Sequence, residues 1–76
     1  MTITLLGKPN CVACVATERE LTKRGLDYNK LDVTEDPTAY DRAVSLGHMA
    51  APVVIVEETG ENWSGFRPER ISSLVE

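Results

Sequence analysis

The segment Cys11-Val12-Ala13-Cys14 contains the only two cysteines of the chain, and it lies between a β-prone segment and the start of a helix-like one. Two intervening residues let the sulfurs meet across one helical turn, so dithiol and disulfide can interchange without refolding the chain. At a helix N-terminus, free N–H groups and the positive end of the dipole favour the thiolate, which is the reactive form. We therefore interpret the pair as a thiol–disulfide exchange site, with Cys11 as the attacking thiolate and Cys14 as the resolving thiol.

Other uses of a close cysteine pair are less well supported by the sequence. A structural disulfide around so small a loop would constrain the unfolded chain by only about 2 kcal/mol. Cys-x-x-Cys is half of a common zinc ligand set, but the chain has no second cysteine pair, and its single histidine, His48, cannot complete four ligands. A metal or iron–sulfur cluster shared between two chains would have four thiolates, and such a non-enzymatic carrier stays open as an alternative.

Length and charge limit the remaining possibilities. The 76 residues predict a single domain over residues 1–76 with a small core, and 42% hydrophobic residues are typical of a folded globule. The net charge of −4 is dispersed, and no cluster of Lys and Arg indicates nucleic-acid binding. No apolar run approaches the roughly 20 residues that span a bilayer. Met1-Thr2-Ile3-Thr4 lacks the features of a secretory signal, so we expect a cytoplasmic protein. In a reducing compartment a close cysteine pair is typically catalytic.

The first third of the chain predicts a strand followed by a helix. Thr2–Leu6 is β-prone, and after a short loop Asn10 is a good helix cap. The helix is expected over Val12–Arg24 and to end at Gly25. Its apolar stripe is narrow and consists of Cys14, Thr17 and Leu21. This spacing turns Cys14 toward the core and leaves Cys11 at the surface.

The middle of the chain predicts a second strand and a second helix. Residues 28–33 alternate in the manner of a half-buried strand. Asp36 and Pro37 then supply the cap and first turn of a helix that Gly47 ends. The apolar face of this helix is expected to contain Ala39, Tyr40, Ala43, Val44 and Leu46.

The last third predicts two strands and a final helix. The β-branched run Pro52–Val56 is typical of a strand buried on both faces. Thr59-Gly60 turns the chain into a short strand around Asn62-Trp63, and Pro68 begins a helix. Its apolar positions are Ile71, Leu74 and Val75.

The predicted order is therefore β-α-β-α-β-β-α. Strands joined through a helix are expected to be parallel, and the last two strands to form an antiparallel hairpin. Three helices on the two faces of a mixed four-stranded sheet make an α/β three-layer sandwich. The dithiol then lies at the carboxyl end of the first strand, where ligands gather in such sheets.

This arrangement resembles the thioredoxin-like fold and, within it, the small glutaredoxin-like proteins. Ala51-Pro52 before a β-branched strand is similar to the cis-proline that faces the dithiol in that fold. Residues 63–71, Trp-Ser-Gly-Phe-Arg-Pro-Glu-Arg-Ile, resemble the segment that marks the NrdH-type redoxins, as does Cys11-Val12-x-Cys14 followed by Ala16-Thr17. The resemblance covers essentially the whole chain. One departure is Ala13, where such redoxins often carry Gln.

The resemblance implies a particular electron route. NrdH-type redoxins receive electrons from thioredoxin reductase, an NADPH-dependent flavoprotein, and pass them to the large subunit of class Ib ribonucleotide reductase. It implies a monomer with no bound cofactor besides the redox-active cysteine pair. The partner-binding residues that we predict are Lys8, Val12, Ala13, Ala51, Pro52, Trp63, Ser64, Gly65, Phe66 and Arg67.

Several of these residues have a simpler interpretation. Lys8 could favour the Cys11 thiolate or could be a solvated surface lysine, and Trp63 and Phe66 could contact a partner or cover the sheet edge and last helix. A rival redox function is that of a glutaredoxin that uses glutathione or another low-molecular-weight thiol. Glutathione is anionic, so its site should offer cations and a Gly-Gly-Asp/Ser-like stretch after the hairpin. The chain carries Trp-Ser-Gly-Phe at that place, which argues against this rival.

Overall fold

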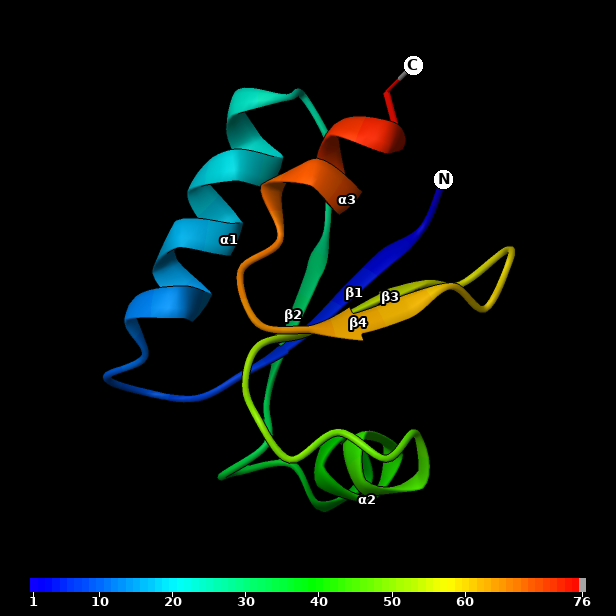
Figure 1. Ribbon diagram of the computed structural model, residues 1–76. Coiled ribbons are helices and arrows are strands. Elements are labelled where there is room, and N and C mark those ends of the chain that lie inside the picture. The colour runs from blue at the N-terminus through cyan, green and yellow to red at the C-terminus, as the bar shows by residue number, and fades with distance from the viewer. Residues whose placement is uncertain (76) are drawn as a thin grey trace.

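The computed structural model describes residues 1–75 and contains the seven elements in the predicted order (Figure 1). They are β1 (Ile3–Gly7), α1 (Val12–Lys23), β2 (Asn29–Asp32), α2 (Pro37–Ser45), β3 (Val53–Val56), β4 (Asn62–Ser64) and α3 (Pro68–Ser73). Figure 1 shows α1 and α3 on one face of the sheet and α2 on the other. The three-layer sandwich with a mixed four-stranded sheet is thus confirmed.

The sheet has the strand order β2-β1-β3-β4. β1 pairs in parallel with β2, as the crossover through α1 predicts, and β3 and β4 form the expected antiparallel hairpin. The expectation that the link through α2 also joins parallel strands is wrong, because β3 runs antiparallel to β1. The pairing explains this result. β2 ends beside Gly7 and β3 begins beside Leu6, so the link through α2 leaves and re-enters the sheet at the same end.

Helix α1 is capped by a residue other than the one that we expected. Asn10 has a positive φ of 56° and lies before the cap, whereas Cys11 is extended and is the N-cap residue. Its Sγ accepts a hydrogen bond from the backbone N–H of Cys14 at 3.1 Å. Asn tolerates the left-handed region, so Asn10 fits the turn before the helix, and the sulfur of Cys11 takes the capping position. The predicted stripe is confirmed, since Cys14, Thr17 and Leu21 are the buried residues of α1.

The core consists of two clusters, one on each side of the sheet. Alternate side chains of β1 and β3 point to opposite faces, which divides their apolar residues between the clusters. The cluster beneath α1 and α3 contains Ile3, Leu5, Leu21, Val54, Val56, Trp63 and Ile71. The cluster beneath α2 contains Leu6, Ala39, Ala43, Val53 and Ile55. All four residues of β3 are buried, which confirms the interpretation of this run as a strand covered on both faces.

Two elements are more exposed than the sequence pattern suggested. β2 is an edge strand with three exposed residues, so the expected half-buried alternation is wrong. Helix α2 buries only its two alanines, and Tyr40, Val44 and Leu46 lie exposed on its surface. The small alanine side chains let the helix approach the sheet, and nothing else in residues 1–75 covers its larger apolar side chains.

Glu57, directly after β3, ties α2 to the sheet. Its carboxylate accepts two hydrogen bonds from the Arg42 guanidinium, at 2.8 and 2.6 Å, and one from the Thr4 hydroxyl. These bonds, with Arg42 first, lower the pKa of Glu57 from 4.5 to about 2. These bonds hold the last turn of α2, which contains Arg42, against the sheet.

Candidate functional site

The two cysteines form a disulfide at the N-terminus of α1, with their Cα atoms 5.2 Å apart. Their environments differ as the sequence predicts. Cys14 is only 2% exposed, whereas Cys11 is half-buried and reaches solvent. Val12, between them, is 86% exposed, so the surface next to Cys11 is apolar.

Gly7, at the end of β1, lies beside the inner sulfur, a contact that the sequence analysis missed. A Cβ at this position would lie 3.5 Å from the Sγ of Cys14, an ordinary van der Waals distance, and 3.3 Å from Cδ2 of Leu5, a tighter one. The missing side chain therefore avoids a close contact with Leu5 and leaves the end of β1 next to Cys14. Glycine is common where strands end, so the residue pattern did not indicate this contact.

The predicted proline loop lies beside the disulfide. The Ala51-Pro52 peptide bond is cis, as expected from the resemblance. The carbonyl oxygen of Ala51 lies 3.9 Å from the Sγ of Cys11. Pro52 is buried, and its carbonyl oxygen accepts a hydrogen bond from the backbone N–H of Gly65 at 2.8 Å. Backbone contacts therefore connect the dithiol, the proline loop and the segment after β4.

The predicted partner-binding residues of the segment Trp63–Arg67 lie partly in the core and partly on the surface. Trp63 is 3% exposed and packs in the core, with the Arg70 guanidinium 4.8 Å from the centre of its ring. Its indole Nε1 is buried and has no hydrogen-bond partner within residues 1–75. Phe66, by contrast, is 42% exposed. Arg67 donates from Nε to the carbonyl oxygen of Ser64 at 3.2 Å, which orders the turn. The exposed aromatic side chain of this segment is thus Phe66, whereas Trp63 belongs to the core.

His48 lies in the loop before the proline and connects that loop to β4. Its Nε2 lies 2.7 Å from the amide oxygen of Asn62, whose amide nitrogen donates to the carbonyl of Gly60. An amide oxygen only accepts, so Nε2 of His48 carries the proton in this contact. The sequence analysis did not foresee this contact, since the two residues are 14 positions apart.

The disulfide opens into a depression of about 740 Å³ with charged walls. Its charged lining residues are Lys8, Glu18, Arg19 and Lys30. Glu18 bonds to Lys30 at 3.0 Å, so one of the three cations is neutralised locally. Lys8, predicted from the sequence, therefore lies beside the site together with two cations that the sequence analysis did not single out.

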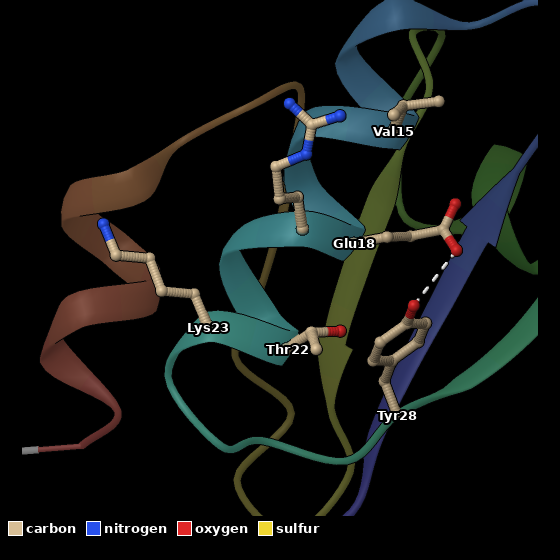
Figure 2. A pocket seen from close by; sticks show the side chains of 6 residues that line it. Val15, Glu18, Thr22, Lys23 and Tyr28 are labelled. Carbon is tan, nitrogen blue, oxygen red and sulfur yellow. Dashed lines mark hydrogen bonds between the residues drawn. The ribbon is translucent and has the colours of Figure 1, made fainter.

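A second, shallower groove of about 580 Å³ continues along α1 (Figure 2). Figure 2 shows Glu18 pointing toward Tyr28, and its carboxylate accepts a hydrogen bond from the Tyr28 hydroxyl at 3.0 Å. Burial, followed by this bond, raises the pKa of Tyr28. The phenol thus stays neutral, and it positions the Glu18 carboxylate between α1 and β2.

The described part of the chain, residues 1–75, lacks two features. No group of three or more His, Cys, Asp or Glu side chains is arranged to hold a metal ion. None of the helices in this part of the chain combines the length and the apolar character needed to cross a bilayer.

Comparison with known proteins identifies the class that this fold and site define. The family model described as Glutaredoxin matches residues 3–60. The chain therefore belongs to the glutaredoxin family. The glutaredoxin-like protein NrdH of Escherichia coli K12 is 38% identical over 97% of this chain and 89% of its own length. That of Lactococcus lactis subsp. cremoris is 28% identical over 95% and 97%, respectively.

A solved structure extends the same comparison. The NrdH-redoxin of Escherichia coli superposes with a TM-score of 0.89 at 38% identity, covering 97% of this chain and 95% of that one. The resemblance to NrdH-type redoxins and the thioredoxin-like fold are thereby confirmed. The cysteine pair of this chain is accordingly the redox-active pair of a glutaredoxin-like protein.

Proposed function

We propose that this chain is a dithiol–disulfide oxidoreductase that thioredoxin reductase reduces and that donates electrons to the large subunit of class Ib ribonucleotide reductase. The asymmetry of the two sulfurs carries the proposal. Cys11 is accessible, and its sulfur already accepts the Cys14 N–H bond at 3.1 Å, a contact that stabilises a thiolate. Cys14 is buried one helical turn away. It is therefore shielded from a partner disulfide and reacts with the mixed disulfide that forms at Cys11.

The reaction follows from this arrangement. In the reduced protein the Cys11 thiolate attacks one sulfur of a partner disulfide, and the other partner sulfur leaves as a thiolate and takes up a proton. Cys14 then loses its proton and attacks the Cys11 sulfur, which releases the second partner thiolate. Two electrons pass to the partner, together with one proton that Cys14 gives up and one from solvent, and the disulfide between Cys11 and Cys14 is restored. Ala51 and Pro52 offer the backbone surface against which the partner segment lies.

The proposed partners are supported by the relatives. Several matched proteins are named NrdH, and the Escherichia coli NrdH-redoxin is described as having a thioredoxin-like activity profile. We transfer this profile to the present chain, with NADPH as the ultimate electron source. The chain would work as a monomer in the reducing cytoplasm, where the dithiol is regenerated after each turnover.

A glutathione-dependent activity is the second candidate, because the depression next to the disulfide carries the cations that such a ligand needs. Lys8, Arg19 and Lys30 line it. The two candidates are separated by supplying NADPH with thioredoxin reductase in one assay and with glutathione and glutathione reductase in another. The proposal expects the reductase to be much the faster donor.

Single cysteine variants test the mechanism in a coupled NADPH-oxidation assay with thioredoxin reductase and a disulfide-containing partner. Cys11→Ser should abolish partner reduction, because the attacking sulfur is lost. Cys14→Ser should accumulate a mixed disulfide through Cys11, visible by mass spectrometry and reversed by dithiothreitol. Full activity of Cys11→Ser, or a covalent adduct at Cys14 in the wild type, would contradict the assignment of roles.

A further inference from the structure

The charge around the disulfide is opposite to that of the chain as a whole. Three cations and one carboxylate line the depression, a formal charge of +2, whereas the complete chain carries −4. Among the acidic residues within residues 1–75, only Glu18 lines it. Within this part of the chain, the dithiol therefore lies in a locally positive region.

Two of these cations are available to a ligand. Within residues 1–75, neither Lys8 nor Arg19 forms an ion pair, and both are exposed. Lys30 is the partner of Glu18 and offsets the one carboxylate. Lys8 lies in the loop between β1 and Cys11, and Arg19 lies on α1 beyond Cys14, so these two cations line the depression from both sides of the cysteine pair in the chain.

We infer that the site selects disulfides that lie in an acidic segment of the partner protein, with Lys8 and Arg19 as the specificity-determining residues. This inference rests on the proposed function and names its substrate class. A positive depression in a negative protein attracts an acidic segment and repels basic ones, and such steering chiefly raises the association rate. An extended peptide fits the open shape, because the depression continues into the groove along α1. Val12, which lies between the two cysteines and is largely exposed, adds an apolar contact for the residues next to the partner cysteine.

Paired peptides test the inference. Two synthetic peptides carry the same intramolecular disulfide, flanked by glutamates in one and by glutamines in the other, and glutathione disulfide is a third probe. The reduced full-length protein is mixed with each, and the second-order rate constant is measured at about 0.01 M and about 1 M salt, where the Debye lengths are about 30 and 3 Å. We expect the acidic peptide to react roughly tenfold faster at low salt and the ratio to approach one at high salt.

Charge variants locate the effect. The double variant Lys8→Gln/Arg19→Gln should lower the ratio of the acidic to the neutral rate at low salt to about one-third or less. The ratio is the appropriate readout, because any influence of Lys8 on the Cys11 thiolate affects both peptides alike. Lys23→Gln is the matched control. This residue lies on the same helix at the far end of the second groove, as Figure 2 shows, and does not line the depression of the dithiol.

The outcomes separate this inference from the function on which it rests. Equal rates for both peptides, an unchanged ratio in the double variant, or an equal loss in Lys23→Gln would overturn the inference and leave the redox function intact. Faster reduction of glutathione disulfide than of the acidic peptide would also overturn it, in favour of a small anionic thiol. If the wild type reduced none of the probes, the proposed function itself would fail.

Discussion

Replacing Trp63 with Ala should act mainly on stability, because the side chain is buried in the core. It packs with Leu21, Val54 and Ile71 at 3% exposure. Removing such a side chain typically costs about 3–5 kcal/mol. A chain of 76 residues has a total stability of roughly 4–11 kcal/mol. The substitution should therefore remove a large part of the free energy of unfolding. At about 4–8 °C per kcal/mol, it should lower the melting temperature by tens of degrees.

Two companion variants make this prediction specific. Trp63→Phe keeps a ring under Arg70 and loses no hydrogen bond, since Nε1 is unpartnered within residues 1–75, so we expect a cost of only about 1–2 kcal/mol. Phe66→Ala, in the same segment, removes a side chain that is 42% exposed and should cost about 1 kcal/mol or less. If the segment binds the reductase, Phe66→Ala should slow electron transfer more than its small effect on stability explains.

The assays are urea unfolding of the oxidised proteins and the rate of reduction by thioredoxin reductase, at a temperature where each variant is folded. The packing interpretation requires a large loss of stability in Trp63→Ala and a nearly normal rate for the folded fraction. A loss below about 1 kcal/mol together with a tenfold slower transfer would refute it and make Trp63 a partner contact.

Further predictions concern the contacts that hold α2 in place. The folded pKa of Glu57, about 2, lies below its ordinary value of 4.5, so the stabilisation that it contributes is complete above pH 4.5 and is lost as the pH falls toward 2. Glu57→Gln should therefore be about 1 kcal/mol less stable near neutral pH, and urea titrations should show the difference vanish in acid. Asp36 accepts bonds from the N–H groups of Thr38 and Ala39 at 3.0 and 3.2 Å, so Asp36→Ala should cost about 1 kcal/mol. Asp41→Ala, on the exposed side of α2, is the control, and an equal loss in both variants would contradict the capping role.

Much of this structure could be predicted from the residue pattern, because local signals and burial agree. The spacing of Cys14, Thr17 and Leu21 predicted the buried stripe of α1, and the β-branched run predicted a strand covered on both faces. The roles of the two sulfurs stay predictions, but their difference in exposure follows from the same spacing. Where the spacing of apolar residues and the capping residues indicate the same secondary structure, the type of the element can be predicted from the sequence.

The remaining features depend on contacts between distant residues. The direction of β3 is set by where the chain re-enters the sheet, and no residue in the link from β2 signals it. The exposure of Tyr40 and Val44 follows from the edge position of β2 and the small alanines beneath α2. His48 acts through Asn62, 14 positions away, so a single sequence offers no periodic signal for this contact.

The frame of the dithiol is built largely from backbone atoms. The Cys14 N–H binds the Cys11 sulfur, the Ala51 carbonyl lies beside that sulfur, and the Gly65 N–H binds the Pro52 carbonyl. Ala13, the second of the two residues between the cysteines, contributes its carbonyl oxygen, which accepts a hydrogen bond from the Thr17 hydroxyl at 2.8 Å and does not involve the side chain at position 13. Ala13 in place of the frequent Gln therefore changes the side chain beside the sulfurs without changing these backbone contacts. We accordingly place the proposed selectivity at the edge of the depression, where Lys8 and Arg19 form no ion pair within residues 1–75.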